Sequence, residues 1–245
     1  MMKTAILAPL QEELAFLVAE LEKFGLQKRE IRLGRLDVFE FSEIDLLVTY
    51  GGHGKTQFSI QSQYLLCQVP QIQLLVCAGA AGALTSSLNV GDVVVATETV
   101  EHDYNLKFVS RPLPRFAGDP QVIEVLQNLP QSNLAFSVHF GAVASGDEDI
   151  VDAARGQEVM NLTNCIAVAW EGAGGARACK FNEKYYIELR GVTDTANHQA
   201  AADFEANLVI AMHNLAEVIV RWRATLQPSG AAQQCGAADR KEFLH

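Results

Sequence analysis

The chain has 245 residues, a length that fits one α/β domain or two small ones. Hydrophobic residues make up 49% and charged residues 20%, a balance typical of a globular protein that can bury a sizeable core. The net charge of −10 argues against a nucleic-acid-binding surface, because such a surface needs a basic stripe.

The sequence also argues against a membrane protein. No run of about 18 apolar residues appears, so we expect no membrane span. The short apolar run near the N-terminus is broken by Gln11, Glu12 and Glu13, which does not match a secretory signal. Five scattered cysteines predict reduced thiols and a cytoplasmic location. There is no C-x-x-C pair, and we expect neither a metal site nor a cofactor.

Short apolar runs alternate with helix-length amphipathic stretches along the chain. We expect strands at 3–9, 35–41, 44–50, 72–79, 91–100, 136–146 and 185–192, helices at 12–25, 55–68 and 201–224, and a strand passing into a helix at 165–179. A loop of small residues follows the strand at 72–79. This alternation predicts an α/β fold, with a largely parallel sheet wrapped by helices. We expect a domain at 1–226 and a loose tail at 227–245, where the periodicity is lost.

Polar and small residues gather where the expected strands end. They are Glu12 and Glu13, and the segments 51–55, 78–83, 145–150, 170–172 and 193–197. Open α/β sheets bind ligands at the carboxyl ends of their strands. These segments therefore predict a binding site that is rich in carboxylates and poor in positive charge.

Two stretches resemble phosphate-binding motifs but miss the pattern. "GGHGKT" has the end of a P-loop, but residue 49 is Thr where the motif needs Gly, so we interpret it as a tight turn entering a helix. "CAGAAGA" has Cys77 where a dinucleotide fingerprint begins with Gly. We interpret it as a tight loop whose backbone comes close to a ligand.

Five motifs occur in the order of a known family. "AILAPLQEEL", "GGHGK", "AGAAGALTSSLNVGDVVVATETVEHD", "SGDEDI" with "VAWEGAG", and "RGVTDTAN" resemble the purine nucleoside phosphorylase/nucleosidase superfamily, most closely its 5'-methylthioadenosine/S-adenosylhomocysteine nucleosidases. The resemblance spans about residues 3–222. It implies a single three-layer domain with a mostly parallel, mixed, twisted sheet. It also implies a homodimer whose partner closes the 5' pocket.

The resemblance also implies roles for particular residues. Glu13 and Arg190 lie by the attacking water, Glu171 binds the ribose hydroxyls, and Asp194 faces the purine N7 with support from Thr193. Other expected contacts to the nucleoside come from Ala80, Ile150, Phe204 and His53. Where this sequence departs from the pattern, Ala80 replaces a serine, Asp149 an aromatic, Trp170 a methionine and Ala169 an acid. Asp149 and Trp170 are therefore the residues expected to set the preferred base.

The chemistry of an N-glycosidic bond agrees with this layout. Its cleavage makes an oxocarbenium-like sugar and an electron-rich base, as in glycoside hydrolysis. The base leaves well when a carboxylic acid with a raised pKa protonates it, the role implied for Asp194. A second carboxylate, Glu13, can orient or deprotonate water. A third, Glu171, can accept hydrogen bonds from two vicinal hydroxyls.

Each acid also has a purely structural interpretation. Asp194, Glu13 and Glu171 all stand where a carboxylate can cap a helix or interact with its dipole. His102 and Asp103 resemble part of a metal site or a dyad, although a surface turn is the preferred interpretation.

Water is the favoured acceptor, because the turn "APLQEE" has acids and no Arg, and an acid repels phosphate. The alternatives are a purine nucleoside phosphorylase, a futalosine-type hydrolase, and an inactive nucleoside-binding or storage relative.

Overall fold

A computed structural model describes residues 3–226, and the tail expected at 227–245 lies outside the described residues. Its strands are β1 (Thr4–Ala8), β2 (Arg29–Leu33), β3 (Leu36–Phe41), β4 (Leu46–Tyr50), β5 (Leu74–Ala83), β6 (Val93–Glu101), β7 (Arg115–Ala117), β8 (Val138–Ser145), β9 (Ala167–Ala169) and β10 (Tyr185–Asp194). Its α-helices are α1 (Gln11–Lys23), α2 (Lys55–Gln68), α3 (Pro120–Gln127), α4 (Ala153–Thr163), α5 (Gly172–Phe181) and α6 (Ala200–Thr225). A short 3₁₀ helix, η1 (Ser42–Ile44), precedes β4.

The strands form one mixed sheet that closes on itself at one end. In the order β5-β1-β4-β3-β2, β1 is parallel to both β5 and β4, while β3 and β2 continue antiparallel. At the other end, β10 pairs with both β5 and β6, and β9 pairs with both β8 and β5. Since β6 also pairs with β8, the five strands β5, β10, β6, β8 and β9 form a ring.

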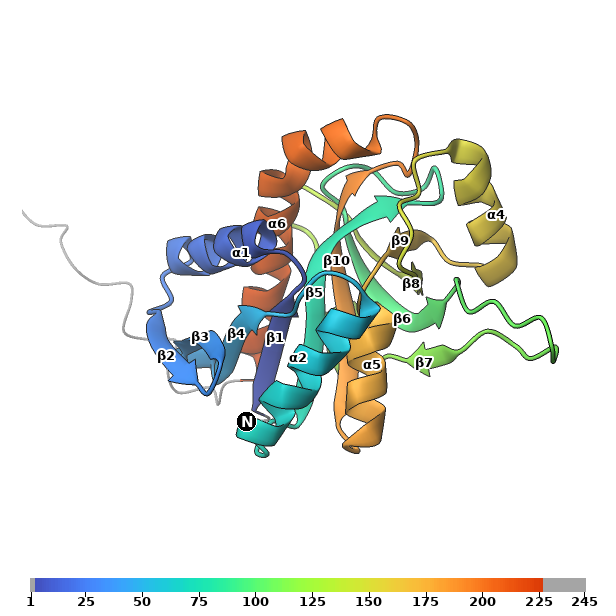
Figure 1. Cartoon of the computed structure of the whole chain (residues 1–245). Coiled ribbons are helices and arrows are strands. Elements are labelled where there is room, and N and C mark those ends of the chain that lie inside the picture. The colour runs from blue at the N-terminus through green and yellow to red at the C-terminus, as the bar shows by residue number, and fades with distance from the viewer. Residues whose placement is uncertain (1–2, 227–245) are drawn as a thin grey trace, which may run out of the picture.

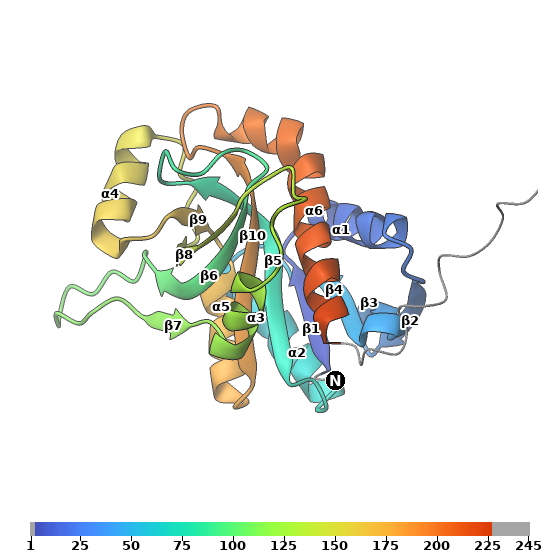
Figure 2. The same cartoon turned by 180° about the vertical axis from the view of Figure 1, so that it is seen from behind.

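Helices cover both faces of the sheet, which explains the continuous apolar runs of β1 and β5 (Figures 1 and 2). In β1, Ile6 packs into the core under α1 and α6, while Leu7 packs into the core under α2 and α5. In β5, Val76 packs on the same side as Ile6, and Leu75 packs on the same side as Leu7. Successive side chains on a strand point to opposite faces, so a strand buried on both faces must be apolar at every position.

The predicted α/β class with a mixed sheet is confirmed, and the expected helices at 12–25, 55–68 and 201–224 correspond to α1, α2 and α6. The turn expected at "GGHGK" is also present, because Gly54 has φ +81° and is the N-cap of α2. One expectation about the strands is wrong. The small residues 78–83 continue β5 to Ala83 rather than forming a loop, because both β10 and β9 pair with that stretch.

Within residues 3–226, no helix combines the length and the apolar character needed to cross a membrane.

Candidate active site

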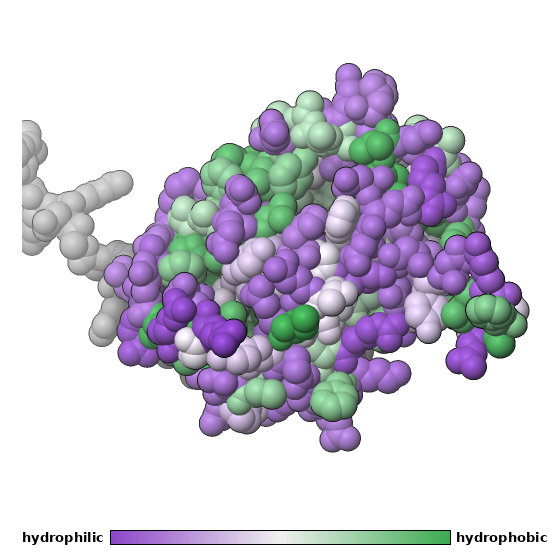
Figure 3. All heavy atoms as spheres, in the orientation of Figure 1, coloured by the Kyte–Doolittle hydropathy of each residue, from purple (hydrophilic) through white to green (hydrophobic). Residues whose placement is uncertain are grey.

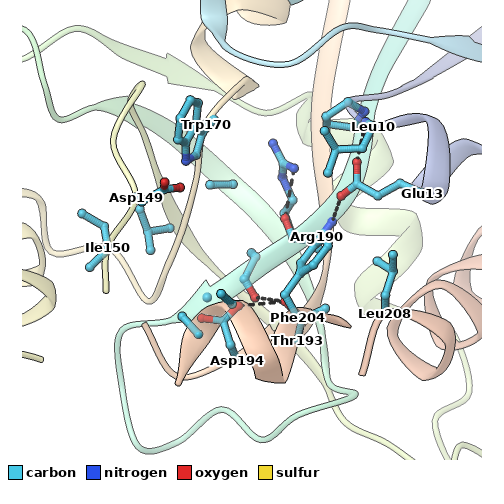
Figure 4. Close-up of a pocket in the computed structure, with 18 of the residues that line it drawn as sticks. Leu10, Glu13, Asp149, Ile150, Trp170, Arg190, Thr193, Asp194, Phe204 and Leu208 are labelled. Carbon is cyan, nitrogen blue, oxygen red and sulfur yellow. Dashed lines mark hydrogen bonds between the residues drawn. The ribbon is translucent and has the colours of Figure 1, made fainter. Parts of the chain in front are cut away.

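A cavity of about 760 Å³ lies where β5, β9 and β10 end, beside the N-terminal turns of α1 and α6. Its lining contains all eleven residues that the sequence predicted for the site: Glu13, His53, Ala80, Asp149, Ile150, Trp170, Glu171, Arg190, Thr193, Asp194 and Phe204. Figure 4 shows Glu13 on one side of it, Trp170, Asp149 and Ile150 on the other, and Asp194 at the end of β10. The fold therefore brings together residues that are up to 191 positions apart in the chain, from Glu13 to Phe204.

Glu13 lies in the first turn of α1 and is buried, with 2% of its surface exposed. One carboxylate oxygen accepts the backbone N–H of Leu10 at 2.8 Å, which is half of a capping box, and the other accepts the N–H of Ala80 at 2.7 Å. The capping interpretation thus holds for one oxygen, while the other reaches across to β5. Burial, followed by the nearby charge of Glu171, raises the pKa of Glu13 from 4.5 to about 7. Glu13 can therefore exchange a proton near neutral pH.

Arg190 lies on β10 and is 1% exposed, so its hydrogen bonds must all be made within the protein. Its guanidinium donates to Glu188 Oε1 at 2.7 Å, to the carbonyl of Ala80 at 3.1 Å and to Cys77 Sγ at 3.3 Å. It also lies 3.4 Å from Glu171 Oε2. Arg190 consequently links the two strands β5 and β10 to a carboxylate that lines the cavity.

Glu171 is the residue before α5, but its side chain makes no capping hydrogen bond to that helix. Its Oε1 instead accepts the backbone N–H of Gly54 at 3.2 Å and lies 3.6 Å from His53 Nδ1. The turn at 51–55 thus holds one oxygen of Glu171, and Arg190 holds the other. Anchoring at both oxygens fixes the carboxylate in the cavity wall.

Asp194 is the last residue of β10, and the structural interpretation as a helix cap is wrong for it, because α6 begins after Gln199. Its two oxygens accept the N–H of Ala196 and the hydroxyl of Thr193, both at 2.9 Å. Burial raises the pKa of Asp194 above its ordinary value, although these two hydrogen bonds oppose the shift. A raised pKa favours the protonated form that a general acid needs.

A bulge at the end of β10 places Thr193 and Asp194. Val192 pairs with Ala81, and Asp194 pairs with the very next residue, Gly82, which leaves Thr193 as the extra residue. A Cβ atom at Gly82 would lie 2.7 Å from Asp194 Oδ1, so a larger residue there would displace the carboxylate. The bulge lets two consecutive residues line the cavity, whereas an undisturbed strand would turn one of them away.

The opposite wall is formed by an aromatic pair and the segment 145–151. The rings of His53 and Trp170 lie 4.2 Å apart. Asp149 is exposed in the cavity mouth beside buried Ile150. The segment is held by Asp147, which accepts the N–H of Lys55 at 2.7 Å. This wall offers aromatic surface with the carboxylates of Glu148 and Asp149 beside it, a suitable partner for a heterocyclic base.

The remaining end of the cavity is apolar inside and acidic at its rim. Leu10, Phe16, Phe204 and Leu208 come from the first turns of α1 and from α6, and they line this end together with the exposed Glu12 and Glu205. Such a lining accepts an apolar substituent.

His102 lies in a turn after β6, as expected, but this turn is not at the surface for His102, because its side chain is fully buried. Within the described part of the chain, neither ring nitrogen has a hydrogen-bond partner, and the nearest carboxylate oxygen, of Glu148, is 3.8 Å away. Burial lowers the pKa of His102. No group of His, Cys, Asp and Glu among residues 3–226 is arranged to hold a metal ion.

Sequence reasoning missed Glu188, which binds Arg190 from behind the cavity wall. The sequence does indicate this pair, because Glu188 and Arg190 are two positions apart on one strand and so point to the same face of the sheet. It also missed Leu10 and Leu208, which are close to the acids only in the folded chain.

Known proteins are similar to this chain over most of its length. The family model of the phosphorylase superfamily matches residues 3–222. An aminodeoxyfutalosine nucleosidase of Campylobacter jejuni is 28% identical over 213 residues, which cover 84% of this chain and 91% of that protein. A 5'-methylthioadenosine/S-adenosylhomocysteine nucleosidase of Geobacillus sp. is 26% identical over 237 residues, which cover 92% of this chain and all of that protein, 100%.

Two solved structures are similar across nearly the whole chain. A 5'-methylthioadenosine/S-adenosylhomocysteine nucleosidase from S. pneumoniae, solved with a transition-state inhibitor, has a TM-score of 0.80 at 26% identity and covers 92% of this chain and 100% of its own. A futalosine hydrolase of Helicobacter pylori has a TM-score of 0.81 at 23% identity, with 91% and 98% covered, and that likeness concerns the fold.

Proposed function

Because this chain belongs to the phosphorylase superfamily, we propose that it is a nucleosidase, which hydrolyses the N-glycosidic bond of a purine nucleoside and releases the free base. The observation that carries the proposal is that Glu13, Glu171 and Asp194, from three separate elements, line one cavity. Cleavage of an N-glycosidic bond can use a general acid, a carboxylate that acts on water and an acceptor for the ribose hydroxyls, and these three carboxylates can fill those roles.

Asp194 is the general acid. The electrons of the broken bond flow into the purine, and a proton from Asp194 to N7 makes the base a good leaving group. The buried position of Asp194 supports this role, since burial favours its protonated form. The hydroxyl of Thr193 orients the carboxyl group by donating to Oδ2.

Glu13 acts on the water that attacks the anomeric carbon of the sugar. Its position across the cavity from Trp170, and its pKa of about 7, support a role in orienting and deprotonating that water. Glu171 accepts the hydrogen bonds of the two ribose hydroxyls, and Arg190 holds this carboxylate in place.

Water is a better acceptor than phosphate in this cavity. Among the described residues that line it, Arg190 is the only arginine or lysine, and its guanidinium already donates to Glu188, Ala80 and Cys77. A phosphate dianion would have to lie beside Glu13 and would find no free guanidinium or ammonium group. This argument favours hydrolysis over phosphorolysis.

The 5' substituent and the base define the substrate more closely. We favour a 5'-methylthioadenosine or S-adenosylhomocysteine type of nucleoside, because Leu10, Phe204 and Leu208 offer an apolar end to the cavity. Aminodeoxyfutalosine is the second candidate, on the strength of the relative named for it at 28% identity. Asp149, as a hydrogen-bond acceptor beside Trp170, selects among bases by the N–H groups that they offer.

The proposal extends to assembly and location. We propose that residues 1–226 form the catalytic domain and that the protein acts as a homodimer. The segment between β6 and β7 supports this assembly, because Phe108 and Val109 in its middle are 103% and 53% exposed. Figure 3 shows hydrophobic surface at the far right, where this segment projects from the molecule in Figure 1. A cytoplasmic location is supported by the unpaired thiols of Cys67, Cys77, Cys165 and Cys179.

A screen of nucleosides tests the proposed function. Adenosine, inosine, guanosine, 5'-methylthioadenosine, S-adenosylhomocysteine and aminodeoxyfutalosine are each incubated with the protein, with and without phosphate, and free base and ribosyl products are measured. We expect base release at the same rate in both conditions, with a free reducing sugar as co-product. Release that requires phosphate and yields a ribose 1-phosphate would identify a phosphorylase. Tight binding without release would identify an inactive binding protein.

A further inference from the structure

Glu188 is a buried carboxylate that does not line the cavity but lies directly behind Arg190. Glu188 has no exposed surface, and its side chain has two partners. Oε1 accepts the Arg190 Nε–H at 2.7 Å, and Oε2 accepts the hydroxyl of Thr99 on β6 at 2.5 Å. Burying a carboxylate costs desolvation free energy, so packing alone does not explain an acid in this position.

The surrounding backbone is shaped to admit this carboxylate. Gly172, the first residue of α5, lies against it, and a Cβ atom there would be 2.1 Å from Glu188 Oε2. Any other residue at 172 would displace the carboxylate or the helix. Tyr186, two residues earlier on β10, donates its hydroxyl to the carbonyl of Gly172 at 2.8 Å and so fixes the same corner.

Three carboxylates and a thiol surround the guanidinium of Arg190. The guanidinium faces Glu188 on β10, Glu171 before α5, Glu13 on α1 and the thiol of Cys77 on β5. Burial raises the pKa of Cys77 well above its ordinary value, so that group is a neutral thiol. One positive charge is therefore shared among three carboxylates, and only Glu13 and Glu171 line the cavity.

The way in which the charge of Arg190 is divided among the three carboxylates affects the protonation of Glu13. Burial and the charge of Glu171 favour its protonated form, whereas Arg190 favours its ionised form. If Glu188 were neutral, the full charge of Arg190 would act on Glu13 and Glu171 alone. Glu13 would then lose its proton more readily and would be a weaker base.

We propose that Glu188 is a positioning residue that acts through Arg190: it fixes the guanidinium and cancels its charge, and so governs how readily Glu13 takes up and releases a proton. The effect of Glu188 on catalysis depends on the proposed function. The charge coupling among Glu188, Arg190 and Glu13 is a property of the free protein.

The test compares the variants Glu188→Gln and Glu188→Asp with the unsubstituted protein. The Gln variant removes the charge and keeps the shape, while the Asp variant keeps the charge but draws it back from Arg190. The matched control is Glu20→Gln, which removes another carboxylate that is 3% exposed, is paired with His213 and lies about two turns further along α1 than Glu13. Two readouts are taken for each protein. One is the pH dependence of kcat/KM for base release, and the other is the titration of Glu13 by ¹³C NMR of labelled Glu carboxyl groups, assigned with Glu13→Gln.

We expect the rising limb of kcat/KM and the NMR midpoint of Glu13 to move together to lower pH in Glu188→Gln, by about one pH unit, since one charge acts at a distance of several ångströms across a partly polar interior. Glu188→Asp should move both in the same direction by less, which keeps the test usable if the Gln variant does not fold. Glu20→Gln should move neither.

An NMR midpoint that stays in place in both Glu188 variants overturns the inference, whether or not the protein releases a base. If no nucleoside is cleaved but the midpoint moves, the proposed function fails and the charge coupling stands. A midpoint that moves in Glu20→Gln as much as in Glu188→Gln would also overturn it, because the effect would then not run through Arg190.

Discussion

Replacing Asp194 with Asn removes the acidic proton of the side chain but keeps its shape and most of its hydrogen bonds. Asp194 is 8% exposed, and its Oδ1 accepts the N–H of Ala196 at 2.9 Å, a bond that the amide oxygen of Asn can keep. In the unsubstituted protein, Oδ2 of Asp194 accepts the hydroxyl of Thr193 at 2.9 Å. With an amide nitrogen in that place the hydroxyl can turn and donate to the carbonyl of Ala81, which is 3.4 Å away. We therefore expect a loss of about 1 kcal/mol or less in the free energy of unfolding.

The effect on catalysis should be much larger than the effect on stability. Asn can donate a hydrogen bond to a purine N7, but it cannot transfer a proton. General acid catalysis contributes about 10²- to 10⁴-fold, which corresponds to about 3–5 kcal/mol in the activation free energy. The ribose contact of Glu171 and the stacking surface of Trp170 remain, so kcat should fall by this factor while the KM changes little.

The assay measures free base release under steady-state conditions, together with thermal unfolding. Asp119→Asn is the matched control, because Asp119 is also a buried acid that accepts a backbone N–H, from Val122 at 2.9 Å, but it caps α3 away from the cavity. The control should keep its kcat. If Asp194→Asn also keeps a kcat near that of the unsubstituted protein, the proton comes from another group and the assignment of Asp194 is wrong.

Three further predictions concern other parts of the structure. The raised pKa of Glu13 means that its protonated form stabilises the fold at low pH, and that this contribution is lost as the pH rises from 4.5 through about 7. Glu13→Gln should therefore have a free energy of unfolding higher than that of the unsubstituted protein at about pH 8, by up to about 3 kcal/mol, and should show little difference at about pH 4; equal differences at both would contradict the shift. Asp149→Phe should change the ratio of kcat/KM between adenine and oxo-purine nucleosides, and an unchanged ratio would mean that Asp149 does not contact the base. Gly174→Ala should cost about 1–3 kcal/mol in chemical denaturation, because the new Cβ atom would lie 2.3 Å from the carbonyl oxygen of Lys55, whereas Gly156→Ala, with no atom nearer than 3.5 Å, should cost nothing or stabilise α4 slightly; equal costs would refute the close contact of α2 and α5.

The sequence by itself determined the class of fold and the family. Strands buried on both faces must be apolar throughout, so β1, β4 and β5 were visible as short continuous runs between amphipathic helices. The order of the motifs identified the phosphorylase superfamily, which the family model confirms. The apolar runs are local features and the motifs follow one another along the chain, so both can be recognised without knowing the fold.

Several elements, among them α3, α4 and β2, lie outside those that the sequence pattern predicted. Asp119 followed by Pro120 is a strong start for a helix, and α3 begins there, but its eight residues are too few for a clear periodic pattern. In the same way, Asp152 caps α4. The strand β2, "REIRL", is largely exposed at the edge of the sheet, and its charged residues hide the apolar alternation.

Only the tertiary structure decided how the site residues meet. Whether residues 78–83 form a loop or a strand depends on β9 and β10 arriving to pair with them, and no local preference of Ala and Gly encodes that pairing. The same pairing creates the bulge at Thr193 and brings Arg190 to the carbonyl of Ala80. The charge of Glu13 depends on burial and on neighbours more than 150 residues away, Glu171 and Arg190. Desolvation and Coulomb interactions depend on distance in space, and distance in space is fixed only when the whole sheet has closed.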